Sequence, residues 1–322
     1  MYKLILYPIA FVVFVLSSVR NKLYDFKILK RTYSKLPVIS IGNIQMGGTG
    51  KTPFVVSLCE KLLQKNIQPI IITRGYKRNS NTQIFFKTLN EYSVQEVGDE
   101  PYLQKLKLPD VNIIIDQNKS QAIKMANNLS DIDCIILDDG FQSNYIEKNI
   151  EIVLINNWHA EKKFKIFPIG QLRESATNLK KADYIFTTKG NNHYKILNHY
   201  NAQSLNISYE ILDDKSKKIR PSDLIKLNSK KKIYGLCGIA NPEQFFESLE
   251  SLKINCDKKI KVPNHFDYNK YNRQLIDNEN IIYITTYKDY FKTNFKKSTV
   301  FVLDMCINIE DETLIKNIKN LI

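Results

Sequence analysis

The stretch IGNIQMGGTGKTP, residues 41–53, places four glycines and a Gly-Lys-Thr triplet between two apolar segments. The segment before it, PVISIGNI at 37–44, is typical of a buried strand, and the apolar residues after it recur at helical spacing. Strand, glycine loop and helix in this order are the setting of a phosphate-binding P-loop. Loop N–H groups that no side chain covers can close on phosphate oxygens. The sequence therefore predicts a nucleotide site in an α/β domain.

Within this loop, Lys51 is predicted to reach the outer phosphates and the Thr52 hydroxyl to ligate Mg²⁺. The strict pattern has a glycine six residues before the lysine, where this chain has Gln45. The alternative is a chance glycine turn between strand and helix, which the intact flanks and the Gly-Lys-Thr triplet disfavour. The residues expected to contact the nucleotide are Gln45, Met46, Gly47, Gly48, Thr49, Gly50, Lys51 and Thr52.

Short apolar runs rich in β-branched residues recur along the chain and alternate with helical patterns. They occupy 37–44, 69–76, 111–116, 134–141, 150–156 and 182–188. This alternation is typical of a doubly wound parallel sheet covered on both faces. After a lysine-rich stretch near 207–231, the pattern restarts at 233–239, 281–286 and 299–305. We expect an α/β protein with a P-loop NTPase-like domain at 37–210 and a second, smaller α/β domain at 211–322.

The first 36 residues differ in character from the rest. Leu4–Val19 is almost wholly apolar, and Arg20–Lys35 carries six basic residues against one acid. The apolar run is shorter than the roughly 20 residues of a spanning helix. A signal-peptide core and a buried core helix are alternatives, although a nucleotide site starting about twenty residues later argues against export. We expect a membrane-associated helix on an anionic surface, and its depth of insertion stays open.

The net charge of the chain indicates the kind of partner that it binds. The 322 residues carry a formal charge of +14, which favours an acidic partner such as nucleic acid, anionic lipid or a phosphorylated substrate. No RNA-recognition or zinc-finger signature supports nucleic acid, so we expect none to bind.

The five cysteines are scattered without a CxxC pair, which indicates reduced core thiols. We expect a monomer.

Two acids follow a predicted strand directly in CIILDDGF. In P-loop enzymes such a strand delivers an aspartate to the Mg²⁺ shell, so Asp138 and Asp139 are candidate metal ligands. An ordinary Asp-Asp-Gly turn is the alternative. The Pro/Gly-rich loop FPIGQLRE holds Arg173, which can clamp a phosphate.

Other candidates are ambiguous when taken alone. Asp99 in VGDEP fits a helix cap as well as a functional acid. TRGY at 73–76 follows a strand, at the edge where α/β proteins bind ligands. His265 in PNHFDY is a single loop histidine, a type that is more often unremarkable.

Taken together, these motifs resemble the tetraacyldisaccharide 4′-kinase family of Gram-negative bacteria. GNIQMGGTGKTP, TRGY, VGDEP, LDDGFQ, FPIGQLRE, CGIANPEQFF, PNHFDY and TTYKD occur in the family's order, from the amino-terminal helix to about Asp289. The resemblance implies an ATP- and Mg²⁺-dependent kinase acting on the 4′-hydroxyl of a lipid A disaccharide 1-phosphate precursor. It implies a place at the cytoplasmic face of the inner membrane.

The resemblance also implies roles for single residues. Asp99 would activate the sugar hydroxyl with His265 as its partner, and Lys51 would act with them in catalysis. Asp138 and Asp139 would arrange Mg²⁺ together with Thr52. Four further residues match positions that line the family's active-site cleft and would contact substrate: Arg74, Tyr76, Glu100 and Arg173.

The chain departs from the family pattern at several places. Ser143 stands where a histidine is usual, and Asn264 where an aspartate commonly precedes the histidine of the Asp–His pair. Lys119 falls near a usual arginine, and Asn156 replaces an aspartate at a strand end. None of these removes a residue assigned to chemistry, but each affects the surroundings of the site.

Two other functional classes fit part of this sequence. A membrane-associated ATPase switch also carries a GGxGKT loop, but it needs a lysine just before the two glycines, where this chain has Met46. A scaffold that has lost catalysis would not be expected to keep Lys51 and Asp99. ATP-dependent dimerisation without a phosphoryl acceptor would support the switch, and ATP turnover would exclude the scaffold.

Overall fold

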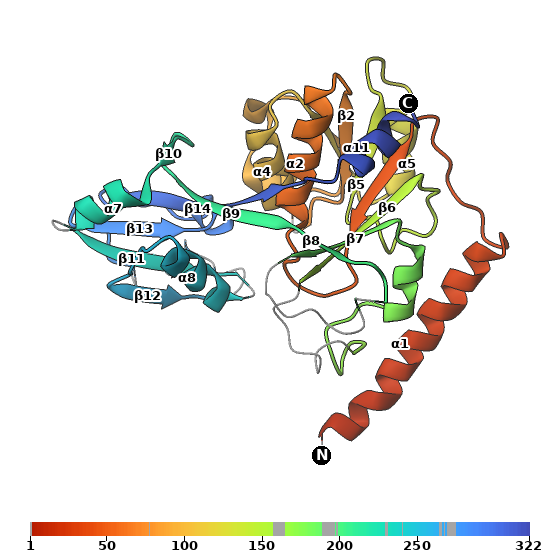
Figure 1. Cartoon of the computed structure of the whole chain (residues 1–322), viewed down its shortest axis with the longest axis horizontal. Coiled ribbons are helices and arrows are strands. Elements are labelled where there is room, and N and C mark those ends of the chain that lie inside the picture. Colours follow the sequence, from red (N-terminus) through yellow and green to blue (C-terminus); the bar gives the residue numbers. More distant parts are fainter. Residues whose placement is uncertain are drawn as a thin grey trace. The chain divides into compact units, whose positions relative to one another are not determined.

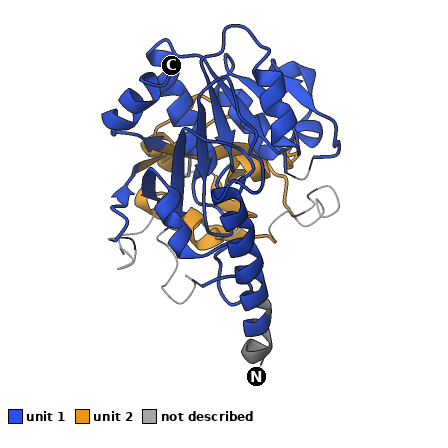
Figure 2. Cartoon of the chain, turned by 90° about the vertical axis from the view of Figure 1, so that its right-hand side faces the viewer, with its two compact units in different colours: residues 1–206, 307–322 blue, residues 207–306 orange. Residues whose placement is uncertain are grey.

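A computed structural model gives the structure of the protein. It describes residues 2–76, 78–156, 165–188, 197, 199–228, 231–239, 241–263, 266, 268 and 275–322. The chain forms two compact units, one from residues 1–206 and 307–322 and the other from residues 207–306 (Figure 2). The first unit is therefore built from both ends of the chain.

The division of the chain differs from the expected one at its carboxyl end. Residues 307–322 were expected in the smaller domain and belong to the first unit. The reason is the last helix, α11 (Glu312–Lys319), which buries Leu314 and Ile318 completely. Its Asn317 amide also donates to the hydroxyl of Tyr184, the first residue of strand β7 (Tyr184–Thr188) of the first unit, at 2.7 Å.

The first unit contains an eight-stranded sheet in the order β3-β4-β2-β5-β1-β6-β7-β8 (Figure 1). All its neighbouring strands run parallel except β3, which is antiparallel to β4. The strands are β1 (Val38–Gly42), β2 (Pro69–Thr73), β3 (Ile84–Phe86), β4 (Asn112–Ile115), β5 (Cys134–Asp138), β6 (Ile150–Asn156), β7 (Tyr184–Thr188) and β8 (Gln203–Ser204). The predicted doubly wound α/β fold is confirmed.

Helices cover this sheet because its central strands are apolar on both faces. Every residue of β1, β2 and β5 is buried. One face packs on α5 (Lys119–Ala126) through Ala122, Ile123 and Ala126. The other helices with bounds in the described part of this unit are α1 (Tyr2–Asp25), α2 (Lys51–Gln64), η1 (Leu89–Glu91), α3 (Val94–Val97), α4 (Asp99–Lys107), η3 (Ala176–Lys181) and α11.

The second unit contains a six-stranded sheet in the order β10-β9-β14-β13-β11-β12. Its strands are β9 (Asn206–Leu212), β10 (Lys218–Ile219), β11 (Lys232–Cys237), β12 (Lys258–Lys261), β13 (Ile281–Thr285) and β14 (Thr299–Asn308). The helices whose bounds the described residues give are α7 (Pro221–Asn228), α8 (Pro242–Ser251) and α10 (Tyr287–Tyr290). β12, β11, β13 and β14 run parallel, and the apolar runs expected at 233–239, 281–286 and 299–305 form three of them. This is the predicted second α/β unit.

Helix α1 is exposed to solvent along part of its length. Phe11 is 66% exposed and Leu16 is 65% exposed, whereas Asn21 near the end of the helix is 4% exposed. Among the helices that the structure describes, none has both the length and the apolar character needed to cross a bilayer.

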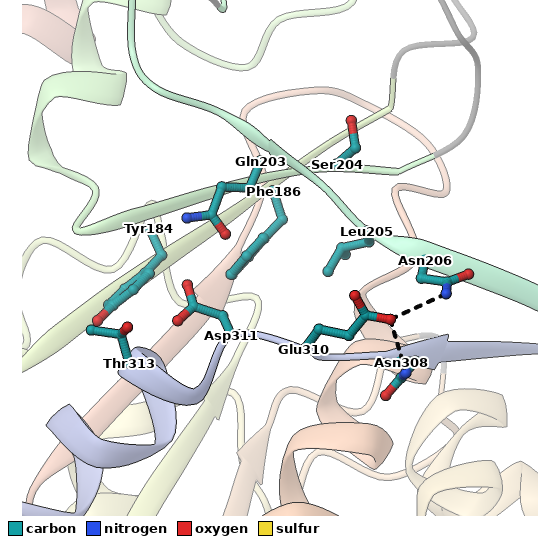
Figure 3. Close-up of a pocket in the computed structure, with 10 residues that line it drawn as sticks. All are labelled: Tyr184, Phe186, Gln203, Ser204, Leu205, Asn206, Asn308, Glu310, Asp311 and Thr313. Atoms are coloured by element: carbon teal, nitrogen blue, oxygen red, sulfur yellow. Dashed lines mark hydrogen bonds between the residues drawn. The ribbon is translucent and has the colours of Figure 1, made fainter.

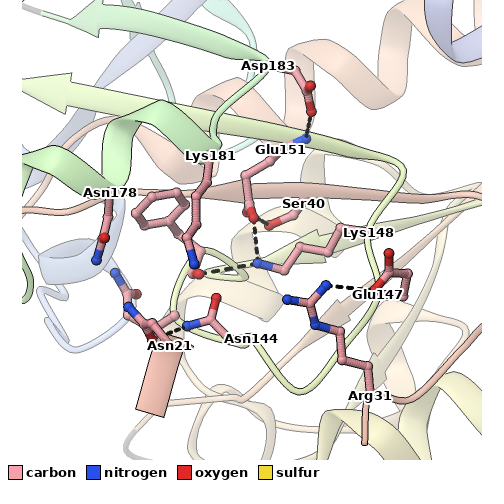
Figure 4. Close-up of polar contacts among 12 residues, drawn as sticks. Asn21, Arg31, Ser40, Asn144, Glu147, Lys148, Glu151, Asn178, Lys181 and Asp183 are labelled. Atoms are coloured by element: carbon pink, nitrogen blue, oxygen red, sulfur yellow. Dashed lines mark hydrogen bonds and ion pairs between the residues drawn. The ribbon is translucent and has the colours of Figure 1, made fainter. Parts of the chain in front are cut away.

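Polar contacts fix the carboxyl end of α1 to the first unit (Figure 4). The Asn144 amide donates to Asn21 Oδ1 at 2.6 Å, after the β5 strand. Asp25 pairs with Lys181 of η3 at 2.9 Å and with Arg31 at 3.1 Å. The helix therefore ends against the segments that follow Asp139 and Arg173 in sequence.

Candidate functional site

The predicted P-loop lies between β1 and α2, at the carboxyl edge of the sheet. Helix α2 begins at Lys51 after Gly50, which has a left-handed φ of 82° and gives no side-chain cap. The first N–H groups of a helix have no partner within the helix, and its dipole attracts anions there. Gly47 has a φ of 103°, and a Cβ at Gly47 or Gly48 would meet nothing within 4 Å. The loop therefore presents an open, glycine-lined surface beside a helix amino terminus, as a phosphate group needs.

The departure at Gln45 has a structural reason. The buried Gln45 side chain accepts from the Asn156 N–H at 2.8 Å and donates to the Asn156 carbonyl at 3.2 Å. The Asn156 amide in turn donates to the Gly48 carbonyl at 3.1 Å. Two departures from the usual pattern, Gln45 and Asn156, thus hold one another and fix the loop to the end of β6.

A second segment runs along the other side of the loop. The Met46 N–H donates to the Gln171 carbonyl, and the Arg173 N–H donates to the Ile44 carbonyl, both at 2.7 Å. Gln45 also forms an antiparallel bridge with Leu172. These backbone bonds bring the loop FPIGQLRE beside the P-loop and place Arg173 next to it.

The Asp139 carboxylate forms ion pairs with both Lys51 and Arg173. Lys51 Nζ lies 3.3 Å from Asp139 Oδ1, and an Arg173 nitrogen lies 3.1 Å from Asp139 Oδ2. Burial raises the pKa of Asp139, but the charges of Lys51, Arg173 and Lys119 outweigh it and lower that pKa to about 2. The backbone of Asp139 is left-handed, with a φ of 52°, which turns the chain out of β5. Asp139 is thus an anion at neutral pH, in a cluster of cations.

Asp138 lies in a different environment although it is adjacent. It ends β5 and is 2% exposed, and the Gln104 amide donates to its Oδ2 at 2.8 Å. Its Oδ1 is buried without a hydrogen-bond partner among the described residues. Burial, together with the negative Glu100, raises the pKa of Asp138 to about 6. A buried carboxylate oxygen in this state favours a proton or a cation.

Two residues that the sequence did not mark as functional hold these acids in place. The Lys119 ammonium donates to the Asp138 and Asp139 carbonyls at 2.7 Å each. Burial lowers the pKa of Lys119 to about 8. Gln104 of α4 is fully buried against Asp138. A buried glutamine in a helix has no sequence signal, whereas Lys119 was visible as a departure from a usual arginine.

Asp99 is the first residue of α4, and Gly98 occupies the cap position with a φ of 95°. The capping alternative for Asp99 is therefore wrong. A Cβ at Gly98 would lie 3.2 Å from the Tyr76 carbonyl, so VGDEP and TRGY are in contact. Asp99 and Glu100 are half-buried, and Arg74 and Tyr76 are exposed.

The partner histidine of Asp99 and the Mg²⁺ ligands are the two remaining predicted features of the site. His265 lies outside the described residues, so its pairing with Asp99 stays a prediction. Within the described residues, no group of three His, Cys, Asp or Glu side chains could hold a metal ion. Thr52 is the second residue of α2, Asp138 is the last residue of β5, which pairs with β1, and Asp139 follows it directly.

Comparison with known proteins gives a consistent result over the whole chain. The family model described as tetraacyldisaccharide-1-P 4′-kinase (LpxK) matches residues 2–322. The chain is 29% identical to the tetraacyldisaccharide 4′-kinase of Aquifex aeolicus, covering 97% of this chain and 96% of that one. It is 31% identical to that of Ruthia magnifica, covering 97% and 95% of the two chains.

A solved structure agrees with these relatives. The crystal structure described as LpxK from Aquifex aeolicus in complex with ATP superposes with a TM-score of 0.82 and 28% identity, over 100% of this chain and 99% of that one. The fold, the P-loop geometry and the whole-chain match lead to one conclusion: this chain belongs to the tetraacyldisaccharide-1-P 4′-kinase family.

Proposed function

We propose that the P-loop site of the first unit transfers the γ-phosphate of ATP to the 4′-hydroxyl of a tetraacyldisaccharide 1-phosphate. The observation that carries this proposal is the convergence of Lys51 and Arg173 on Asp139, beside an open glycine loop. Two cations that meet at one acid next to a helix amino terminus can neutralise the charge that develops on a transferring phosphoryl group.

The 4′-oxygen of the sugar forms a bond to the γ-phosphorus, and the bond from that phosphorus to the β,γ-bridging oxygen breaks to release ADP. The proton of the 4′-hydroxyl passes to the Asp99 carboxylate, which His265 is proposed to assist. Arg74, Tyr76 and Glu100 are proposed to line the acceptor side, since TRGY and VGDEP are in contact at Gly98.

The residues at the end of β5 suit Mg²⁺. Magnesium prefers oxygen ligands and is usually held by one or two carboxylates with substrate phosphates. The unpartnered Oδ1 of Asp138 meets this requirement, and Asp139 and Thr52 are the proposed additional oxygen donors. The ion would supply charge neutralisation on the phosphate oxygens. Lys119 and Gln104 keep the two acids in place for it.

We propose that the protein acts at a membrane because of its substrate class. Removing an acyl chain from a bilayer costs about 0.8 kcal/mol per CH₂, so a tetraacylated substrate stays in the lipid. We propose that α1 brings the enzyme to the cytoplasmic face of the inner membrane through exposed residues such as Phe11 and Leu16. The basic residues after the helix would add attraction to anionic lipid.

The test is direct transfer of label. Purified full-length protein is incubated with γ-labelled ATP, Mg²⁺ and detergent-dispersed disaccharide 1-phosphate. Label on the lipid that is lost in Lys51→Ala supports the proposal. ATP hydrolysis without labelled lipid would contradict the proposal and support an ATPase switch instead. The whole-chain family match disfavours that alternative.

A further inference from the structure

Helix α1 has two different sides among its described side chains. One stripe, with its members three or four residues apart, is buried or half-buried and consists of Ala10, Val13, Ser17, Asn21 and Tyr24. The apolar side chains that are at least half exposed include Phe11, Val12, Leu16 and Val19. The protein therefore covers one stripe of the helix and leaves an apolar face open.

The carboxyl end of α1 is closed by a defined turn. The Lys27 N–H donates to the Tyr24 carbonyl at 3.0 Å. The Ile28 N–H donates to the Leu23 carbonyl, also at 3.0 Å. Lys27 is left-handed, with a φ of 57°. These two bonds around a left-handed residue make a Schellman motif, which ends a helix and fixes the direction in which the chain leaves it.

Two side-chain contacts hold this end of α1 on the first unit (Figure 4). The Asn144 amide donates to Oδ1 of the buried Asn21 at 2.6 Å. Lys181 of η3 pairs with Asp25 at 2.9 Å. We call Asn21, Asp25, Asn144 and Lys181 the α1 clamp. Each contact alone is weak because it is partly exposed, but the two come from different segments and so hold the helix at two points.

The two segments that complete the clamp also begin at the ion-paired residues of the nucleotide site. They are residues 139–144 and 173–181. The Gln142 amide of the first segment donates to Glu174 Oε1 at 2.9 Å, and the Asn178 amide donates to Glu174 Oε2 at 2.6 Å. Glu174 is 4% exposed, so water does not compete strongly for this link. The segments therefore form one cross-linked support between α1 and the nucleotide site.

The only acid of the basic strip is paired within the protein. Among residues 20–35, Asp25 is the single carboxylate, and it pairs with Lys181 and with Arg31. The exposed basic residues of the strip that are left beside the apolar face include Lys22, Lys27 and Lys30. An apolar face flanked by basic side chains suits an anionic bilayer.

We propose that the α1 clamp fixes the angle between the membrane-bound helix and the nucleotide site, so that the site meets a lipid substrate in an anionic bilayer in one orientation. Asn144 and Lys181 are thus positioning residues. A loosely attached helix would let the bound enzyme tilt, which lowers the effective concentration of the site at its substrate. The choice of substrate rests on the proposed function, whereas the orientation itself does not.

The first test compares two ways of presenting the substrate to full-length protein. We measure kcat/KM with disaccharide 1-phosphate in vesicles of phosphatidylcholine and phosphatidylglycerol, and separately with the same lipid dispersed in detergent. In the double variant Asn144→Ala, Lys181→Met, the vesicle value is expected to fall about tenfold while the detergent value stays unchanged. A purely structural defect would lower both values equally.

A matched control removes similar contacts elsewhere in the same unit. Tyr184→Phe removes the hydrogen bond to Asn317 of α11, at the groove shown in Figure 3. Lys180→Met removes the same charge as Lys181→Met, one residue earlier on η3. The control double variant is expected to keep the wild-type ratio of the two kcat/KM values. Both double variants should bind the vesicles to the same extent in sedimentation.

A second test reports the orientation without the reaction. A fluorescent amino acid replaces Lys124, which is exposed on α5, and time-resolved energy transfer to dye-labelled lipids gives its distances from the bilayer. We expect one narrow distance distribution in the wild type and the control, and a broad one in the clamp variant.

Three results would overturn the proposal. They are an equal loss of kcat/KM with both forms of substrate, weaker vesicle binding in the clamp variant than in the control, and an equally narrow distance distribution in the clamp variant. No transfer by the wild type with either form of substrate would instead contradict the proposed function. The distance distributions would then still decide whether the clamp sets the orientation.

Discussion

Lys51 Nζ lies 3.3 Å from Asp139 Oδ1, and the same carboxylate holds Arg173 at 3.1 Å. The P-loop lysine is therefore paired with the acid that directly follows β5, the strand next to β1 in the sheet. This pairing fixes the lysine's direction and keeps two cations close together.

Replacing Asp139 by asparagine should release both cations from their common partner. We expect kcat for phosphoryl transfer to fall by about 10²–10³, the usual effect of losing a preorganised electrostatic contact. Steady-state kinetics with detergent-dispersed substrate measure this. Glu147→Gln removes an acid from the Arg31 ion pair on the same unit and should stay within about twofold of wild type. Equal activity in both variants would remove Asp139 from the site.

Asp99→Asn should separate nucleotide binding from transfer. The residue begins α4 and does not cap it, so the substitution should leave the fold unchanged. Loss of a general base lowers the rate by about 10²–10⁴. ATP affinity, measured by a fluorescent nucleotide, should stay at the wild-type value. A variant that transfers phosphate at the wild-type rate would contradict the assignment of Asp99.

Asp138 should make stability depend on pH. Its pKa is raised from 3.8 to about 6, so the folded state holds a proton that the unfolded chain releases between these values. This contribution to stability is fully present below pH 3.8 and is lost as pH rises through about 6. In metal-free protein, the free energy of unfolding of wild type relative to Asp138→Asn should fall by about 3 kcal/mol from pH 3.5 to pH 7. Urea unfolding at several pH values tests this, and a flat difference would show an unshifted carboxyl.

Gln45→Gly restores the strict P-loop pattern and should still harm the protein. The glutamine exchanges two hydrogen bonds with Asn156, which also holds the Gly48 carbonyl. We expect a loss of about 1–3 kcal/mol in unfolding free energy together with weaker ATP binding. Glu147→Gln, which lies in the Arg31 ion pair and outside the loop, serves as the control. Improved ATP binding in Gln45→Gly would show that the loop does not depend on this pair.

The exposed apolar side chains of α1 should carry membrane binding. Phe11→Glu with Leu16→Glu places two charges on an exposed part of the helix, and the bound fraction on anionic vesicles should fall at least about tenfold. Ile225→Glu on α7 changes an exposed apolar residue of the other unit and should leave binding unchanged. Sedimentation with vesicles measures both. Unchanged binding of the double variant would place the anchor elsewhere.

Much of the fold was predictable because its central strands are continuously apolar and the P-loop has a local pattern. The motif residues Lys51, Asp139 and Arg173 could be selected from sequence, and the structure brings them together. The supporting contacts could not be predicted from sequence. Gln104 and Lys119 lie on helices, and they act on Asp138, which is distant in the chain. The end of the chain was assigned to the wrong unit, since no local pattern shows which sheet a final helix packs on.

The first unit is closed by α11, the last helix of the chain, although its P-loop lies near the beginning. During synthesis, which proceeds from the amino end, the phosphate loop emerges long before α11, the helix that buries its own Leu314 and Ile318 in this unit. A ribosome must therefore deliver the chain through Lys319 before this kinase unit can finish folding. An interrupted translation product would carry the nucleotide motif without the packing that completes its domain.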